Sequence, residues 1–384
     1  MRLRLLPVLL AVLLAAPAVP AQPERSGAVR GRVVDAETGE PLAGAHVFFS
    51  TTMTGTATDT AGRFAFPRGM PVGTQRLHAS MVGYEAQTLD TLLHAGRSYR
   101  LRLALEPTVI EADSVSVTGR SDEGWSLVGD ERWQQRLEKF RRLFVGTSER
   151  AEATTLTNPE ALALHDNWWG RMEADAAAPL VFENRALGYR LRYHLRAFEG
   201  SRTEVRWDGE PHFEKLSPAD STEAARWRAN RRRAFRGSLR HFLLALRGDS
   251  LRQAGFRVRR VPSSSALGPA RAPQGRSGRP VGPEDVLERP APAARDTLPA
   301  GTRRLDFRGR LRIVYTREAE APAFLRWHRA RRAPRDRQRS FLELEDGAVT
   351  VDPAGEIVEP YGATRFGYFA FERLAALLPK GYRP

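Results

Sequence analysis

The sequence predicts a multidomain protein with an N-terminal all-β sandwich, followed by an α+β domain that carries a disordered insertion. Three observations lead to this fold class. Residues 27–106 hold short alternating apolar and polar runs separated by turn residues at roughly 8–12 positions, as in small β-sandwiches. Residues 130–384 mix the period of amphipathic helices with the alternation of strands. Residues 262–304 are rich in Pro, Gly, Ala and Ser, and this composition buries too little apolar surface to offset the entropy of ordering.

Composition and charge exclude several kinds of protein. The 384 residues include no cysteine, which excludes disulfides, a thiolate nucleophile, Cys-based metal sites and a lipid-modified N-terminal cysteine. The formal net charge is +15, and nearly all of the 60 basic residues are arginine. Residues 27–119 carry eight basic and nine acidic residues, whereas residues 120–384 carry 49 and 35. The basic charge is therefore a property of the second domain, and part of it reflects an arginine-biased composition.

The N-terminus has the three parts of a secretory signal peptide. Arg2 and Arg4 form a positive region, an apolar run of about a dozen residues follows, and Val19-Pro20-Ala21 places small residues before Gln22. The alternative is a membrane anchor, but the run is shorter than the roughly 20 residues that cross a bilayer. We expect a cleaved signal peptide at residues 1–21. The mature chain, without a transmembrane segment, is then exported to the periplasm or associated with the cell envelope or outer membrane.

The strands of the sandwich are expected to follow one another closely. Turns separate them, as at Thr38-Gly39-Glu40-Pro41 and Asp59-Thr60-Ala61-Gly62, where Gly and Pro supply the backbone angles that turns need. The expected strands lie at residues 29–35, 45–49, 55–58, 63–66, 75–82 and 99–105.

Three motifs of this region resemble a known family. They are Gly31–Val47, Gly55–Phe64 and Gly83-Tyr84-Glu85, and they are similar to the carboxypeptidase-like regulatory domain. The resemblance implies a transthyretin-like β-sandwich at residues 27–106, of a kind common on bacterial envelope proteins, including the N-terminal extensions of TonB-dependent outer-membrane receptors. It also implies a non-catalytic module, because the family is an accessory domain of metallocarboxypeptidases and carries none of their chemistry.

The second domain is expected at residues 130–384, after a linker at 107–129. Its first helix begins at Asp130 as N-cap, continues through the apolar stripe of Trp133, Leu137, Phe140 and Phe144, and ends at Gly146. Strands are expected within 153–207, at 256–261 and at 305–315, so the low-complexity loop at 262–304 is an insertion between neighbouring strands. Further helices are expected at 218–246 and 366–378.

Four segments of this domain are similar to a region of uncharacterised bacterial envelope proteins that likewise carry the regulatory domain at their N-terminus. They are Asn158-Pro159, Pro179–Tyr189, Trp227–Arg231 and Gly237–Phe242. This resemblance implies a location and a domain order, and no reaction.

No motif indicates catalysis. None of the eight histidines has Glu three residues later, and the sequence lacks H-E-x-x-H, G-x-S-x-G, S-x-x-K and the phosphate-binding glycine loops. We therefore predict no catalytic, cofactor-binding or metal-binding residue, no cofactor and no enzyme. Paired carboxylates leave no sequence signature, so a hydrolase of glycan or peptide remains an alternative, with Glu173, Glu183 or Asp208 as candidate acids.

The most distinctive feature is an arginine-rich helix. Residues 226–260 contain 12 arginines and one acid. Its core face should hold Trp227, Phe235, Leu239, Phe242, Leu243 and Leu246. A second face presents the candidate residues for binding an anion or a partner, which are Arg228, Arg232, Arg236 and Arg240 with His241. The alternative is a solvated helix face.

Two smaller sets of residues carry weaker hypotheses. Asn230, Ser238 and His241 could line a pocket, although hydrogen bonds within the helix are the simpler interpretation. Trp168, Trp169 and Trp207 could stack on sugars, although packing is the simpler interpretation. A second arginine cluster spans residues 326–339.

Together these observations predict a non-enzymatic exported envelope protein. The sandwich would be an interaction or spacer module, and the second domain would bind an unidentified envelope protein or glycan. The alternatives are the hydrolase described above and an electrostatic binder of anionic envelope polymers through the arginine-rich helix. Nucleic acid is not expected as a partner because of the export signal.

Overall fold

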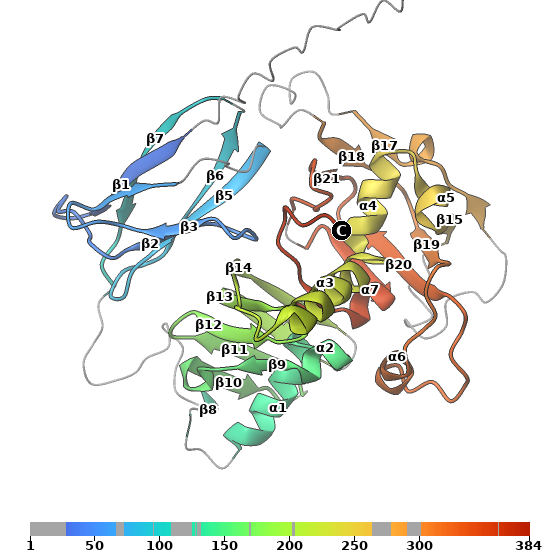
Figure 1. Ribbon diagram of the computed structural model, residues 1–384. Helices are drawn as coiled ribbons and strands as arrows, with labels where there is room; N and C mark the ends of the chain where they lie inside the picture. The colour runs from blue at the N-terminus through green and yellow to red at the C-terminus, as the bar shows by residue number, and fades with distance from the viewer. Residues whose placement is uncertain are drawn as a thin grey trace, which may run out of the picture.

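The structure is a computed structural model with a sandwich beside a larger C-terminal half (Figure 1). The predicted fold class is confirmed, since an all-β region precedes a region of mixed sheets and helices. The expected signal peptide at 1–21 lies outside the described residues. Among the helices of the described residues, none has the length and apolarity needed to cross a membrane. The described residues are 28–384 except 67–72, 95, 109–124, 127, 129–131, 169, 202–203, 263–277, 290–300 and 360.

The sandwich consists of two sheets around one apolar core. One sheet has the order β4-β1-β7 and the other β3-β2-β5-β6. β1 and β7 are parallel, and the other pairs are antiparallel. Alternate side chains enter the core, so Val33, Val47, Leu77 and Leu103 are buried together. The strands are β1 (Val29–Asp35), β2 (His46–Phe49), β3 (Gly55–Ala57), β4 (Arg63–Ala65), β5 (Gly73–Ser80), β6 (Gln87–Leu93) and β7 (Tyr99–Leu105).

The first part of the C-terminal half is a seven-stranded sheet with helices on one side. The order is β8-β10-β11-β13-β12-β9, and β14 pairs with β13 along its other edge. The predicted stripe of Trp133, Phe140 and Phe144 is buried against this sheet. The elements are β8 (Trp125–Ser126), α1 (Trp133–Phe144), α2 (Glu149–Glu152), β9 (Thr154–Leu156), η1 (Pro159–Ala161), β10 (Leu162–Asp166), β11 (Met172–Ala176), β12 (Leu180–Asn184), β13 (Tyr189–Gly200), β14 (Val205–Lys215) and α3 (Ser221–Phe235).

The second part has its own core, in which α4 packs on a five-stranded sheet of order β16-β15-β19-β20-β22. A three-stranded sheet, β17-β18-β21, completes it. The elements are α4 (Leu239–Arg247), α5 (Leu251–Ala254), β15 (Phe256–Val261), β16 (Arg279–Pro280), η3 (Pro283–Asp285), β17 (Leu287–Glu288), β18 (Arg303–Leu305), β19 (Arg310–Tyr315), α6 (Pro322–Trp327), β20 (Gln338–Leu344), β21 (Val349–Val351), β22 (Ala363–Gly367), α7 (Tyr368–Phe371) and η5 (Leu374–Ala376).

The predicted long helix at 218–246 is wrong, because the chain breaks between α3 and α4. Gly237 has φ +74°, a left-handed conformation that ends α3. Ser238 then caps α4 by accepting a hydrogen bond from the His241 amide. The predicted single core face is consequently split, since Phe235 belongs to the first core and Phe242, Leu243 and Leu246 belong to the second.

Three further expectations need correction. Within the insertion at 262–304, the described residues 278–289 form β16, η3 and β17, so Val281 and Val286 are buried in the second core. The helix expected at 366–378 is the end of β22 followed by the short elements α7 and η5. In the expected linker, Trp125 and Ser126 form β8, which pairs with β10.

The first helix begins later than expected. α1 has Arg132 at its N-cap position without a side-chain hydrogen bond, and Asp130 lies outside the described residues. Its predicted end is confirmed, because Gly146 has φ +105° and its amide bonds to the Arg141 carbonyl.

Candidate functional site

Three of the four segments singled out in the second domain meet in the structure: Asn158 bonds to Pro179 and Val181, and Trp227–Arg231 bonds to the β12–β13 turn. The inner face of α3 donates to three successive carbonyls of the β12–β13 turn: Trp227 to Arg185, Asn230 to Ala186, and Arg231 to Leu187, at 2.7–2.9 Å. A Cβ on Gly188 would lie 2.2 Å from the Trp227 ring, so that position requires glycine. The Trp227–Arg231 motif therefore holds α3 on the turn between β12 and β13.

The candidate anion-binding residues divide into two groups. Arg228, Arg232 and Arg236, which we call the α3 arginine face, are exposed. Among the described residues, no carboxylate lies within ion-pair distance of these three. Arg240, in contrast, is nearly buried and is held by Glu356 and by the Leu378 and Pro379 carbonyls.

His241 belongs to the structural group as well. Its Nδ1 accepts the Gly237 amide at 3.1 Å, and burial lowers its pKa to about 4. The predicted pocket of Asn230, Ser238 and His241 is thus replaced by three hydrogen bonds to backbone groups. The second arginine cluster is also partly structural, because Arg332 and Arg335 both pair with the buried Glu320.

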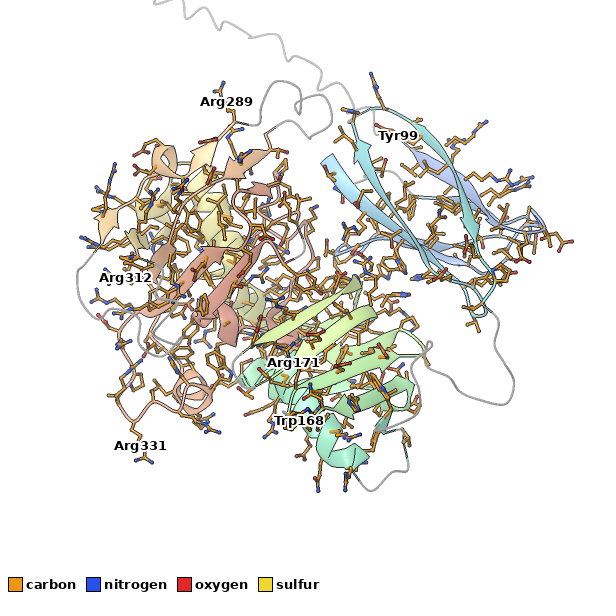
Figure 2. All side chains as sticks on the ribbon, turned by 180° about the vertical axis from the view of Figure 1, so that it is seen from behind. Tyr99, Trp168, Arg171, Arg289, Arg312 and Arg331 are labelled. Carbon is orange, nitrogen blue, oxygen red and sulfur yellow. The ribbon has the colours of Figure 1, made fainter. Side chains whose placement is uncertain are left out.

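The aromatic and acidic candidates are scattered. Trp168, in the turn between β10 and β11, is 82% exposed (Figure 2). Trp169 lies outside the described residues, and Arg373 lies over the Trp207 ring. Glu183 pairs with Arg190 and Asp208 with Arg196. The hydrogen bond from Arg190 lowers the pKa of Glu183, which does not suit it to act as an acid at neutral pH.

The sandwich contacts the C-terminal half through a docking interface between two sheet faces. The outer face of β2 and β5 presents His46, Phe48, Arg76 and His78, because these alternate with core residues. The facing strands β13 and β14 present His194, Arg196, Glu210 and His212. Phe48 is fully buried although it points away from the sandwich core, so the C-terminal half covers it.

Four histidines surround Phe48 at the docking interface. The phenyl ring lies 4.9–5.3 Å from the rings of His46, His78, His194 and His212. His78 Nε2 lies 3.2 Å from His194 Nδ1, across the two halves. Within the described part of the chain, neither ring nitrogen of the buried His212 has a hydrogen-bond partner. A Cβ on Gly55 would approach His212 Nε2 to 2.7 Å, so glycine lets the β2–β3 hairpin come this close.

Burial keeps these histidines uncharged. It lowers the pKa of His78 and His212 to about 4 and that of His194 to about 2, and it also lowers the pKa of His46. Nearby Arg192 and Arg196 and the other imidazoles lower these pKa values further. A surface hollow of about 550 Å³ borders the interface, and His46 and His212 are among its lining residues.

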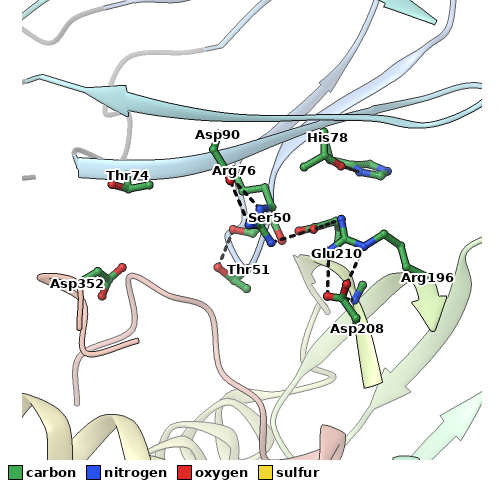
Figure 3. A network of polar contacts seen from close by, with 12 residues as sticks. Ser50, Thr51, Thr74, Arg76, His78, Asp90, Arg196, Asp208, Glu210 and Asp352 are labelled. Atoms are coloured by element: carbon green, nitrogen blue, oxygen red, sulfur yellow. Dashed lines mark hydrogen bonds and ion pairs between the residues drawn. The ribbon is translucent and has the colours of Figure 1, made fainter. Parts of the chain in front are cut away.

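An ion-pair network lies beside the histidines (Figure 3). The Glu210 side chain is only 2% exposed and pairs with Arg76 of the sandwich at 3.4 Å and with Arg196 of β13 at 3.0 Å. Asp90 pairs with Arg76, and Asp208 with Arg196. The buried Glu210 carboxylate is thus paired with one guanidinium group from each half of the chain. Both pairs are present only when the sandwich is docked.

Backbone hydrogen bonds complete the docking interface. The hairpin tip joins the free edge of β14, where Thr51 donates to the Pro211 carbonyl and Phe213 donates to the Thr52 carbonyl. Lys380, near the C-terminus, also contacts the sandwich. Its amide donates to the Thr51 carbonyl and its Nζ donates to the Thr74 carbonyl. The same Nζ pairs with Asp352 of the C-terminal half. The sandwich is therefore bound to its own chain by specific polar contacts.

Two glutamates that the sequence analysis did not single out have raised pKa values. Burial raises the pKa of Glu372 to about 7, although Arg150 at 3.1 Å opposes this. Burial also raises the pKa of Glu318, and the charge of Glu318 contributes to the shift of Glu372. The negative charge of each acid therefore disfavours ionisation of the other. Among the described residues, no group of three or more His, Asp or Glu is arranged to hold a metal ion.

Comparison with known proteins identifies the sandwich. Residues 28–106 match the carboxypeptidase regulatory-like domain, which confirms the predicted resemblance. None of the curated proteins matches the chain.

Solved structures resemble parts of the chain. A mutant type II cohesin–X-dockerin complex from Acetivibrio cellulolyticus is 17% identical with a TM-score of 0.17, and the match covers 20% of this chain and only 52% of that one. The Klebsiella pneumoniae 5-hydroxyisourate hydrolase is 21% identical with a TM-score of 0.18, covering 21% and 92%. A DUF3823 family protein from Bacteroides uniformis is 11% identical with a TM-score of 0.16, covering 50% and 100%. None of these likenesses assigns a ligand or an activity to this chain.

Proposed function

We propose that this protein is an exported, non-enzymatic binding protein of the cell envelope, whose C-terminal half binds an anionic glycan or an acidic protein partner. The observation that carries the proposal is the α3 arginine face. Its three guanidinium groups are exposed, while the opposite side of the helix is anchored by Trp227 and Asn230. A rigid helix that presents unpaired guanidinium forks suits carboxylate, sulfate or phosphate groups.

The sandwich has an accessory role in this proposal. The outer face of its β2–β5 sheet is occupied by β13 and β14 of the same chain, so the sandwich is an intramolecular docking module rather than a free spacer. The supporting contacts are the ion pair of Arg76 with Glu210 and the hydrogen bonds of the hairpin tip.

Reversing the charge of the α3 arginine face should weaken binding to anionic polymers. We expect Arg228→Glu, Arg232→Glu and Arg236→Glu together to reduce affinity for polygalacturonate or polyphosphate at least tenfold, because three favourable charge contacts become repulsive. Fluorescence anisotropy at low and high salt measures this, and salt should weaken wild-type binding because exposed charges are screened.

A charge-matched control separates this site from the overall charge. Arg252, Arg326 and Arg331 are exposed and lie outside α3. Their combined reversal to Glu changes the net charge equally and should leave most of the affinity in place. Equal losses in both variants, or no binding by the wild-type protein, would remove α3 as the binding surface.

Glu318 and Glu372 support the hydrolase as a second candidate function. An acid with a pKa near 7 is suited to donate a proton at neutral pH. In this case the reacting acids are these two and not Glu173, Glu183 or Asp208.

Glu372→Gln tests this candidate and the raised pKa separately. Hydrolysis of peptidoglycan fragments or peptides should be lost in this variant and kept in Glu183→Gln. Absence of hydrolysis by the wild-type protein excludes the candidate.

The raised pKa of Glu372 also predicts how the stability of the protein changes with pH. The preference of the folded state for protonated Glu372 contributes fully to the free energy of unfolding below pH 4.5. This contribution is lost as the pH rises through 7, by up to about 3 kcal/mol. The melting temperature of Glu372→Gln, relative to that of the wild type, should therefore rise from pH 5 to pH 8.

A further inference from the structure

The three-stranded sheet of the sandwich carries an array of arginines on its outer side. Arg30 and Arg32 on β1, Arg63 on β4, and Arg100 and Arg102 on β7 are all exposed. They alternate with Val29, Val33, Phe64 and Leu103, which face the core, so all five project from one face. We call this set the sandwich arginine face.

Strand register places these arginines next to one another. Arg30 lies opposite Arg100, and Arg32 lies between Arg63 and Arg102. Neighbouring strands are about 4.8 Å apart and alternate residues about 7 Å apart, so the five charges form a compact, flat grid. Like charges directly opposite each other destabilise a sheet, and within the described residues none of the five makes an ion pair.

Asp59 lies near Arg32 and Arg63 of this face. Asp59 accepts the Ala61 and Arg63 amides, and the hydrogen bond from the Arg63 amide is the main cause that lowers its pKa, with smaller contributions from the charges of Arg63 and Arg32. This carboxylate is engaged with backbone amides and pairs with none of the five guanidinium groups. The sandwich as a whole is nearly neutral by composition, so this face arises from the fold and not from the average charge of the region.

Within the described part of the chain, this face is open to a partner. Figure 1 shows β1 and β7 on the side of the sandwich that points away from the C-terminal half, whereas β2, β3 and β5 lie toward it. The exposed large hydrophobic residues of the described chain are Met53, Val82, Val128, Trp168, Val358 and Tyr361, and none belongs to β1, β4 or β7. The partner is therefore recognised by charge, without insertion of apolar side chains.

We propose that the sandwich arginine face binds the headgroup phosphates of an anionic membrane surface. A plane of phosphates can meet all five guanidinium groups at once, whereas a single polymer strand that crosses the sheet follows at most the row of Arg63, Arg32 and Arg102. Guanidinium groups pair with phosphate through two parallel hydrogen bonds. Each basic residue near an anionic bilayer strengthens binding by about fivefold, and salt weakens it.

Vesicle co-sedimentation of residues 22–384 tests the proposal. Vesicles of phosphatidylcholine with phosphatidylglycerol should bind the protein in low salt and release it in high salt, whereas vesicles of phosphatidylcholine alone should not bind it. Arg30→Glu, Arg32→Glu and Arg102→Glu together should lower binding at least 100-fold. The same positions changed to Gln give a second variant without reversed charge, and this variant should melt no lower than the wild type because like-charge contacts are relieved.

The control is the reversal of Arg252, Arg326 and Arg331, which should leave most of the vesicle binding. The proposal is overturned if the wild type does not bind anionic vesicles, or if the control loses as much binding as the sandwich variant. It is also overturned if the sandwich variant loses binding only to soluble polyphosphate. Failure here leaves the α3 arginine face untouched, because that site is measured with different variants and soluble polymers.

Discussion

Lowering the pH from 7 to 5 should separate the sandwich from the C-terminal half while each keeps its own fold. The docked state holds His78, His194 and His212 with depressed pKa values, and an exposed histidine titrates near 6.5. The undocked state therefore binds more protons, so docking is complete above pH 6.5 and is lost as the pH falls toward 4. At pH 5 a histidine with a docked pKa of about 4 costs about 2 kcal/mol.

The charged groups around the histidines reinforce this response. Arg192 and Arg196 project from β13, and both repel an imidazolium, whereas the charge of Glu214 partly opposes them at His46 and His212. The acids in the same interface are Asp90, Asp208, Glu210 and Glu214, which are each paired with arginine. They are thus less able to stabilise new positive charge.

Hydrogen exchange measures the opening directly. The Thr51 and Phe213 amides bond across the docking interface and should lose protection at pH 5, after correction for intrinsic exchange. The Val33 amide bonds to the Gly62 carbonyl inside the sandwich and should stay protected. Equal loss at all three amides would indicate unfolding, and unchanged protection at Thr51 would show that the histidines do not control docking.

Replacing Glu210 by Gln should release the sandwich at neutral pH. The carboxylate is almost fully buried between Arg76 and Arg196, and its loss leaves two guanidinium groups without their shared partner. Breaking a buried pair on one side costs about 3 kcal/mol. Urea unfolding should show this loss, and the Thr51 amide should lose protection.

Asp90 provides the matched control for Glu210. It lies in the same network, but its side chain is 58% exposed, so Asp90→Asn should cost less than about 1 kcal/mol. The double variant with Arg76→Gln and Glu210→Gln should recover part of the loss, because it removes one unpaired charge. A cost for Glu210→Gln no larger than that of Asp90→Asn would contradict a role of this carboxylate in docking.

The sandwich was the part of the fold most readable from sequence. Its strands are short, alternate clearly and are separated by Gly and Pro turns, and these local signals agree with the packing. The first helix was predictable for the same reason, through the stripe of Trp133, Phe140 and Phe144. The break at Gly237-Ser238 was also signalled, because glycine followed by an N-cap residue ends one helix and begins another. The apolar pattern on both sides of the break obscured it.

The docking interface was not readable, because its residues come from distant strands. His46, His78, His194 and His212 have no motif spacing, and only the tertiary fold places them around Phe48. One signal was present: Phe48 and Phe49 are adjacent on a strand, so both of its faces are apolar, which is typical of a strand covered on both sides. The sandwich arginine face has no signature in the composition, because the net charge of its region is close to zero.

The contacts of Lys380 impose an order on folding. This residue reaches Thr74 across 306 positions of sequence, whereas the sandwich closes within residues 29–105. Local contacts form fastest, so the sandwich folds before the part of the chain to which it docks has folded. During that interval its outer face meets water, where the same histidines that lie dry around Phe48 are hydrated and partly charged. An entirely apolar face would pack equally well in the folded protein. Before docking, however, it would leave an exposed apolar sheet that can aggregate with other chains.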